Sequence, residues 1–183
     1  SVAKPLSFNR LSNILKSAGA VLGKQTVINY VGYMMDSYLL FTLQNYAAKL
    51  VEKETSPKYY FMDTGLLGLM LMDCSSTQLE NLVAIELIRR YGRENVFYFE
   101  KKVEIDFYVP EEKLAIQVSL QVLDQIDTRE REIGAFVKLK NFIGDATCLL
   151  ITNSEEEELD YEGVHVSVVP VWKWLLQNRK QDI

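Results

Sequence analysis

Three side chains near the middle of the chain follow the spacing of a metal-dependent nuclease core. Glu80 lies in a stretch with helical periodicity, Asp106 lies in the strand-like segment EIDF, and Gln117 lies in the next strand-like segment, AIQVS. Carboxylates on adjacent elements could hold Mg²⁺ or Mn²⁺ against a phosphate, because hard divalent cations prefer oxygen ligands. A metal held there would polarise the phosphate and lower the pKa of an attacking water. The spacing therefore predicts catalytic positions at Glu80, Asp106 and Gln117, with the metal on Glu80 and Asp106.

Two of the positions depart from the pattern of an active core. Gln117 offers a neutral carbonyl where a carboxylate would bind a cation better, and Ser119 stands where the pattern has a lysine. That lysine helps to position the attacking water and to stabilise developing negative charge, so its loss typically costs about 10²–10⁴ in rate. Lys101 or Lys102, in a neighbouring turn, could supply an amine from another strand. The substitutions predict a core that cuts weakly or not at all.

The elements that position these residues follow from the periodicity of the second part of the chain. A helix is predicted over 78–91, and it carries Glu80. On a strand at 103–109, alternation places Glu104, Asp106 and Tyr108 on one face. The acidic run at 155–158 is typical of a solvated loop. A mixed sheet flanked by helices is expected, with the further strands at 95–100, 113–119, 146–152 and 164–171 and the further helices at 128–140 and from 172.

The first 65 residues show the element order of a winged helix. Helices are predicted over 7–18 and 24–37, and strands at 39–46 and 58–62. The second helix carries an apolar stripe that we expect to be buried, made of Val27, Tyr30, Val31, Met34 and Tyr38.

In a winged helix, this second helix would enter the major groove of DNA, with Lys24, Gln25 and Asn29 near the bases. Phosphate contacts would come from the tip of the ribbon, at Lys49, Lys53 and Lys58. Residues 1–65 carry a net charge of +3 and residues 66–183 a net charge of −8, which is a weak electrostatic hint of a nucleic-acid face. Winged helices also serve as protein-packing modules, so both interpretations stay open.

Composition excludes several classes of protein. The hydrophobic fraction of 48% is enough for a packed core, and no apolar run approaches the roughly 20 residues of a membrane span. No signal peptide is visible. Cys74 and Cys148 lack metal-ligand spacing and indicate buried thiols in a reducing compartment, which predicts the cytoplasm. The segment GAVLGKQT has three residues between its glycines, and Gln25 follows Lys24, so it does not match a nucleotide-binding P-loop.

The order and spacing of several segments resemble one family. The segments are LSFNRLSNIL, TVINYVGYMMDSYLLF, KYYFMDTGL, LENLVAIEL, VEIDFYV and VSVVPVWKWLL. Together, over nearly the whole chain, they are similar to prokaryotic AAA-type ATPases that carry a C-terminal domain of unknown function. The resemblance implies an upstream ATPase module, an α/β chain with a winged-helix-like domain at 1–65, and a mixed-sheet PD-(D/E)XK nuclease-like (restriction-endonuclease-like) domain at 66–183. By position, the family's acidic core falls on Glu80, Asp106 and Gln117, and Ser119 departs from the lysine of active nucleases.

Three functions follow as hypotheses. The leading one is a DNA-handling or interaction module of a cytoplasmic ATPase, with a nuclease-like core that is inactive or weakly active and with DNA contacts at Lys24, Gln25, Asn29 and Lys53. The second is an active nuclease that uses Mg²⁺ or Mn²⁺ and a lysine from elsewhere. The third is a protein-interaction module without a nucleic-acid role, which suits the acidic second part of the chain. The expected partners are DNA and the upstream ATPase domain; a homo-oligomer is compatible with the sequence, and a membrane is not.

Overall fold

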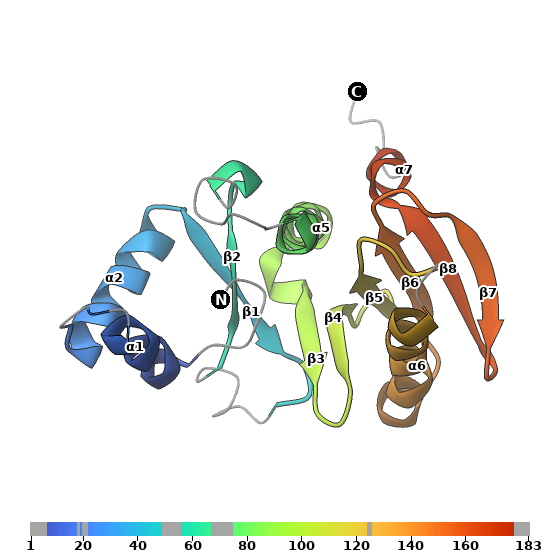
Figure 1. The fold of residues 1–183 in the computed structure, drawn as a ribbon, viewed down its shortest axis with the longest axis horizontal. Helices are drawn as coiled ribbons and strands as arrows, with labels where there is room; N and C mark the ends of the chain where they lie inside the picture. Colours follow the sequence, from blue (N-terminus) through green and yellow to red (C-terminus); the bar gives the residue numbers. More distant parts are fainter. Residues whose placement is uncertain are drawn as a thin grey trace.

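A single mixed sheet organises the chain (Figure 1). The computed structural model describes residues 7–17, 19, 22–48, 56–66, 75–123 and 126–177. Within them, eight strands lie in the order β2-β1-β3-β4-β5-β6-β8-β7. Their bounds are β1 Leu40–Asn45, β2 Lys58–Phe61, β3 Phe97–Glu100, β4 Glu104–Val109, β5 Leu114–Val118, β6 Thr147–Thr152, β7 Glu157–Tyr161 and β8 Val164–Pro170. The expectation of an α/β chain with a mixed sheet is confirmed.

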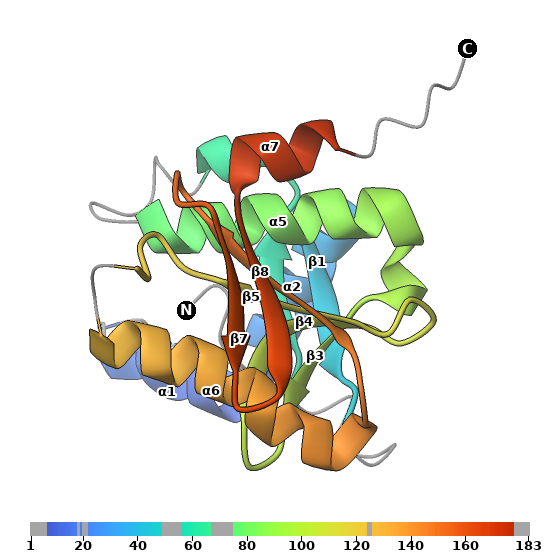
Figure 2. The same cartoon turned by 90° about the vertical axis from the view of Figure 1, so that its right-hand side faces the viewer.

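Helices cover both faces of the sheet. Figure 2 shows α5 and α7 on one side of the strands and α6 on the other. The helices near the N-terminus, α1 and α2, pack against the outer strands β1 and β2 (Figure 1). The bounds are α1 Phe8–Ser17, α2 Lys24–Asp36, α5 Ser75–Tyr91, α6 Ile126–Ile143 and α7 Val171–Leu176, with a short 3₁₀ turn η1 at Arg93–Asn95. No helix among the described residues is long and apolar enough to cross a membrane.

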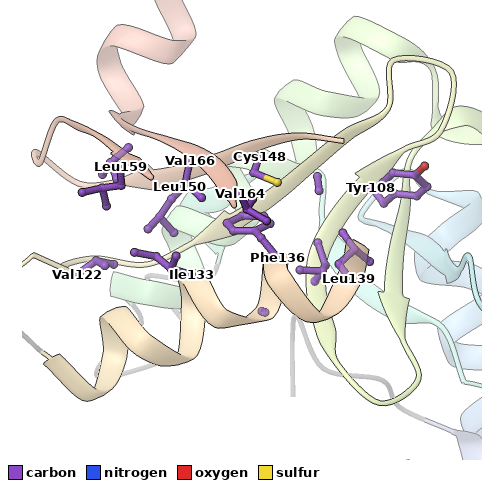
Figure 3. Packing of buried hydrophobic residues seen from close by; sticks show 14 of the residues in the cluster. Tyr108, Val122, Ile133, Phe136, Leu139, Cys148, Leu150, Leu159, Val164 and Val166 are labelled. Carbon is purple, nitrogen blue, oxygen red and sulfur yellow. The ribbon is translucent and has the colours of Figure 1, made fainter. Parts of the chain in front are cut away.

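The two faces of the sheet carry separate cores. Under α5 and α7, the buried side chains include Tyr60, Leu87 and Phe107. Under α6, three side chains of that helix point at the strands (Figure 3), namely Ile133, Phe136 and Leu139. Burial of apolar surface on this scale is the main stabilising contribution to the fold. Because both faces of the sheet are packed, the place of a residue along its strand determines where its side chain lies.

The first two strands belong to this same sheet. β1 pairs with β2 in antiparallel fashion and with β3 in parallel, with Gln44 opposite Phe97 and Asn45 opposite Tyr98. The hydrogen-bonded network thus crosses residue 65, where we expected a boundary between two domains. The four elements α1, α2, β1 and β2 occur in the expected order, but their ribbon forms the edge of the large sheet.

Strand β4 contains a bulge that alternation alone did not predict. Phe97 pairs with Tyr108, whereas Phe99 pairs with Ile105, so β4 uses one residue more than β3 over this interval. An extra residue reverses the in–out alternation beyond it. Tyr108 accordingly packs in the core under α6 together with Ile105. The expected common face of Glu104, Asp106 and Tyr108 is therefore wrong for Tyr108.

Two further expectations need correction. The acidic run was predicted to be a loop, but Glu157 and Glu158 open the edge strand β7, where exposed carboxylates are compatible with one solvated edge. In the stripe expected on α2, Val27 and Val31 are buried, whereas Tyr30 and Tyr38 are exposed by 54% and 80%. Tyr38 lies beyond the end of α2 with a positive φ of 56°, so it leaves the helical face altogether.

Candidate functional site

A buried lysine lies at the centre of the acidic residues. Lys58 is the first residue of β2, and its side chain is 0% exposed. Its Nζ atom lies 3.0 Å from Glu104 Oε1, 3.7 Å from Asp106 Oδ1 and 3.7 Å from Glu80 Oε1. We call these four residues the Lys58 cluster. An amine from the N-terminal part of the chain thus lies beside Glu80 and Asp106.

The surroundings of the amine are aromatic as well as acidic. Lys58 Nζ lies 5.3 Å from the centre of the Tyr98 ring, within the range of a cation–π contact. The hydroxyl of Tyr60, two residues along β2, donates a hydrogen bond of 3.0 Å to Glu80 Oε1. Within the described part of the chain, Nζ has ion-pair partners but no hydrogen bond of regular geometry. The ammonium is held by charge and enclosure rather than by directed bonds.

Helix α5 positions Glu80 through its neighbour Asn81. The Asn81 side chain accepts a hydrogen bond of 2.8 Å from Phe61 N–H and donates one of 2.9 Å to Phe61 C=O. These backbone groups point away from β1, so the amide closes the outer edge of β2 as a further strand would. Asn81 is 0% exposed, and a buried edge left without such partners would be costly. The pairing fixes α5 relative to Lys58 and Tyr60.

Gln117 supports the strands instead of facing a ligand. Its Oε1 accepts a hydrogen bond of 2.9 Å from Asp106 N–H, and its Nε2 donates one of 3.2 Å to Glu104 C=O. The backbone ladder between β4 and β5 covers Phe107 to Val109. Gln117 therefore replaces backbone pairing where the two strands separate, next to the bulge.

Asp106 takes part in the same bridge. Its Oδ2 accepts a hydrogen bond of 2.9 Å from Val118 N–H on β5, and its Oδ1 lies toward Lys58. Ser119 follows this strand, and its hydroxyl donates to the carbonyl of Gln121 at 3.1 Å. Ser119 lines a neighbouring hollow of about 330 Å³ together with Arg131 and Glu132 of α6. The position of the expected lysine thus opens on this hollow, and Lys58 approaches Asp106 from β2.

Electrostatics within the cluster favour a charged lysine and a protonated glutamate. Burial lowers the pKa of Lys58, but Asp106, Glu80 and Glu104 together outweigh burial, and this pKa is raised above its ordinary value. Burial raises the pKa of Glu80 to about 8; the charge of Asp106 acts in the same direction and Lys58 acts against it. The pKa of Asp106 is also raised, by burial first, against Lys58 and the Val118 N–H. At neutral pH, Lys58 is therefore charged and Glu80 holds its proton.

The arrangement does not fit a divalent metal ion as it stands. The Lys58 ammonium lies between the carboxylates that were expected to hold the metal, Glu80 and Asp106. Gln117 commits its carbonyl to a backbone N–H. In the part of the chain that the structure describes, no group of three or more His, Cys, Asp and Glu side chains has the arrangement of a metal site.

The residues expected to contact DNA divide into three groups. Lys24, Gln25 and Asn29 are exposed on α2, with Gln25 Nε2 donating to Asn29 Oδ1 at 3.1 Å. Lys49 and Lys53 lie outside the described residues. Lys58 is buried, so the expectation that it contacts phosphate at a ribbon tip is wrong. Lys101 and Lys102, the other candidate sources of an amine, are exposed, and Lys101 lies over the ring of Phe142.

The sequence did not predict Lys58 beside the acids: it predicted Lys58 at a ribbon tip, and it predicted Glu104 on the face of Asp106 without a partner. A signal for Lys58 was present in the segment KYYF, where a lysine opens a strand of aromatic residues. All four residues of that strand are buried. Lysine is almost never fully buried unless it is paired, so such a position predicts acidic partners from elsewhere in the chain.

Two comparisons show what the chain is similar to. A family model described as a domain of unknown function, DUF8612, matches residues 1–78. The matched segment contains Lys58 and ends within α5, before Glu80. The chain is also 32% identical over 184 residues to a protein of Methanocaldococcus jannaschii named "Uncharacterized protein MJ1544". No solved structure matches.

The similarity to the archaeal protein covers 95% of this chain and 41% of that protein. The chain thus spans about two fifths of the length of this relative. These findings support the expectation that the chain carries a domain of unknown function.

Proposed function

We propose that the chain is a DNA-handling module of a larger ATPase, built around a nuclease-like centre that cuts DNA weakly or not at all. The observation that carries the proposal is the Lys58 cluster, because acids from α5 and β4 meet a lysine amine there within 4 Å. These are the residue types of a phosphodiester-cleaving core. The likeness to a longer protein is compatible with a further domain, and the ATPase is part of the proposal.

Exposed polar side chains on α2 support contact with DNA. Lys24, Gln25 and Asn29 stand on the outer surface of the helix, while Val27 and Val31 anchor its inner face. Amide side chains can form paired hydrogen bonds with adenine in the major groove, and a lysine can neutralise a phosphate. The exposed Tyr33 on the same helix adds a flat surface that could pack against a sugar.

Weak cleavage is expected because the residues of the Lys58 cluster are paired with one another, and not because Ser119 replaces a lysine. The amine is present, but it is buried between the acids, and Gln117 is committed to the strands. The residues that would have to receive a metal and a phosphate are therefore already paired with one another. Binding of DNA without efficient cutting is the function that this arrangement supports best.

The test is fluorescence anisotropy with a labelled DNA duplex at about 50 and 200 mM NaCl. We expect binding that falls steeply with salt, because contacts with phosphates release counterions. The variant K24A/Q25A/N29A should bind at least about tenfold more weakly, since each contact of this kind contributes on the order of 1 kcal/mol. The matched control K138A/N141A removes exposed polar groups from α6 and should leave binding unchanged. Absence of binding at low salt would instead favour a protein-interaction module.

An active nuclease is the second candidate, and one observation favours it. The Lys58 amine lies 3.7 Å from Asp106 Oδ1, so the expected lysine is supplied from β2. Cleavage of DNA with Mn²⁺ that is lost in both D106A and K58M would establish this function. Cleavage that persists in D106A would come from a contaminating enzyme and end this candidate.

A further inference from the structure

We propose that the Lys58 ammonium is a resident cation that occupies the place of a divalent metal, so that Glu80, Glu104 and Asp106 form a latent metal site. The site would accept a divalent ion only when this amine is removed or displaced. The inference rests on the proposed nuclease-like identity of the centre. It differs from that proposal in naming what holds the centre inactive.

The position of the amine carries the argument. Three carboxylate oxygens from two different elements surround one nitrogen atom at 3.0–3.7 Å. Lys58 is fully buried, and within the described residues its Nζ makes no hydrogen bond of regular geometry. A buried lysine usually directs its three N–H groups at acceptors. Here the ammonium acts as a point charge at the centre of the acids, which is the role that a metal ion plays among its ligands.

Charge makes the two cations exclusive. A divalent ion bound by the same oxygens would lie within a few ångströms of the ammonium, which is itself fully buried, so that solvent would screen their repulsion weakly. Glu80 and Asp106 have only 17% of their side chains exposed. Glu132 on α6 is paired with Arg131 at 2.7 Å, so the acids that need a cation here are those of the Lys58 cluster. Only one cation can meet that demand in this space.

Neighbouring groups confine the Lys58 side chain to the centre of the cluster. Tyr60 and Tyr98 flank the lysine on β2 and β3. The Asn81 side chain fixes the backbone of β2 at Phe61, three residues from Lys58. A rotation of the Lys58 side chain would therefore collide with the two tyrosines. Removal of the amine by mutation is the direct test.

The experiment measures binding of Mn²⁺ to the full chain by calorimetry and by the EPR signal of free Mn²⁺, without DNA. The wild type should bind Mn²⁺ weakly, whereas K58M should gain one site that is at least about tenfold tighter, because the carboxylates lose their internal counterion. The double variant K58M/D106N should lose this site. The control K102M removes an exposed lysine from the neighbouring turn and should behave as the wild type.

If K58M folds but binds Mn²⁺ no more tightly than the wild type, the proposal is wrong. Tight binding of Mn²⁺ to the wild type that D106N abolishes would overturn the proposal, because the ammonium would then not exclude the metal. If K58M folds only in the presence of Mn²⁺, the metal has replaced the amine, as proposed. If K58M stays unfolded with Mn²⁺, K58M/E80Q keeps position 80 neutral at every pH and leaves Glu104 and Asp106 for the ion; failure of this variant to fold or to bind Mn²⁺ would also overturn the proposal. Because DNA is absent, failure here leaves the anisotropy test of DNA binding unaffected.

Discussion

Gln117 illustrates how one amide serves the acidic centre without entering it. Its carbonyl accepts from Asp106 N–H, and its amino group donates to Glu104 C=O. A glutamate at this position could accept but could not donate at neutral pH, and it would place a carboxylate oxygen against a carbonyl oxygen. The exchange would restore the acid of an active core and yet break the bridge between β4 and β5.

We therefore predict that Q117E lowers the free energy of unfolding by about 1–3 kcal/mol and does not strengthen Mn²⁺ binding. Urea denaturation and calorimetry would measure the two quantities. The control is Q121E, at an exposed position in the following loop, where a surface change should stay within about 0.5 kcal/mol. A variant Q117E that is as stable as the wild type and binds Mn²⁺ tightly would show that Gln117 is a weakened ligand.

Glu80 should make stability depend on pH. Because its pKa is raised from 4.5 to about 8 in the folded chain, the folded state keeps a proton that the unfolded chain releases within this range. Stability should therefore fall as pH rises between these values, by up to about 1.4 kcal/mol per pH unit for one group. E80Q imitates the protonated acid and can still accept from the Tyr60 hydroxyl, so it should flatten the profile.

The measurement is urea denaturation of the wild type and E80Q across this pH range. E130Q, which neutralises an exposed acid on α6, serves as the control and should keep the slope of the wild type. An unchanged slope in E80Q would mean that Glu80 is ionised in the folded chain and that Lys58 compensates it fully.

At the scale of the element, the outer edge of β2 depends on one side chain of α5. Asn81 pairs with both backbone groups of Phe61, and the same strand presents Lys58 and Tyr60 to Glu80. N81A would leave a buried N–H and a buried C=O without partners. Each such group costs about 1–3 kcal/mol.

We predict that N81A is destabilised by more than about 2 kcal/mol, measured by thermal or urea unfolding. The control N29A makes the same substitution on the exposed face of α2 and should change stability by less than about 0.5 kcal/mol. If N81A unfolds at the same denaturant concentration as N29A, water can replace the amide at this edge, and α5 does not close it.

Elements with a strong apolar periodicity could be predicted from the sequence. Features that depend on pairing with another strand could not. The helix expected over 78–91 appears as α5, and the strand expected at 146–152 appears as β6, because both have clear apolar patterns. The bulge in β4 depends on a partner strand, so no local pattern reveals it. β7 was missed because its residues EELDY are mostly acidic, and pairing with β8 decides their conformation.

For the whole molecule, the Lys58 cluster is assembled from both sides of residue 65, where the sequence predicts a division between domains. Of the candidate site, Glu80 and Asp106 were predicted and do lie together around one atom, Lys58 Nζ. Lys58 itself is separated from them by more than 20 positions of sequence. The parallel pairing of β1 with β3 likewise joins segments about 50 residues apart, and contacts of this kind carry no local signal.

The sheet and the Lys58 cluster together predict that residues 66–183 do not fold without residues 1–65. The shorter chain would expose the edge of β3, which pairs with β1. It would lose Tyr60 from the core and leave the acids of the cluster without their cation, and an uncompensated buried charge costs about 3–5 kcal/mol. NMR spectra of the fragment should show poor dispersion, and addition of residues 1–65 in trans should restore dispersed signals. If the fragment alone gives a dispersed spectrum and unfolds cooperatively, two independent domains exist, and the lysine is an accessory to a centre that is stable without it.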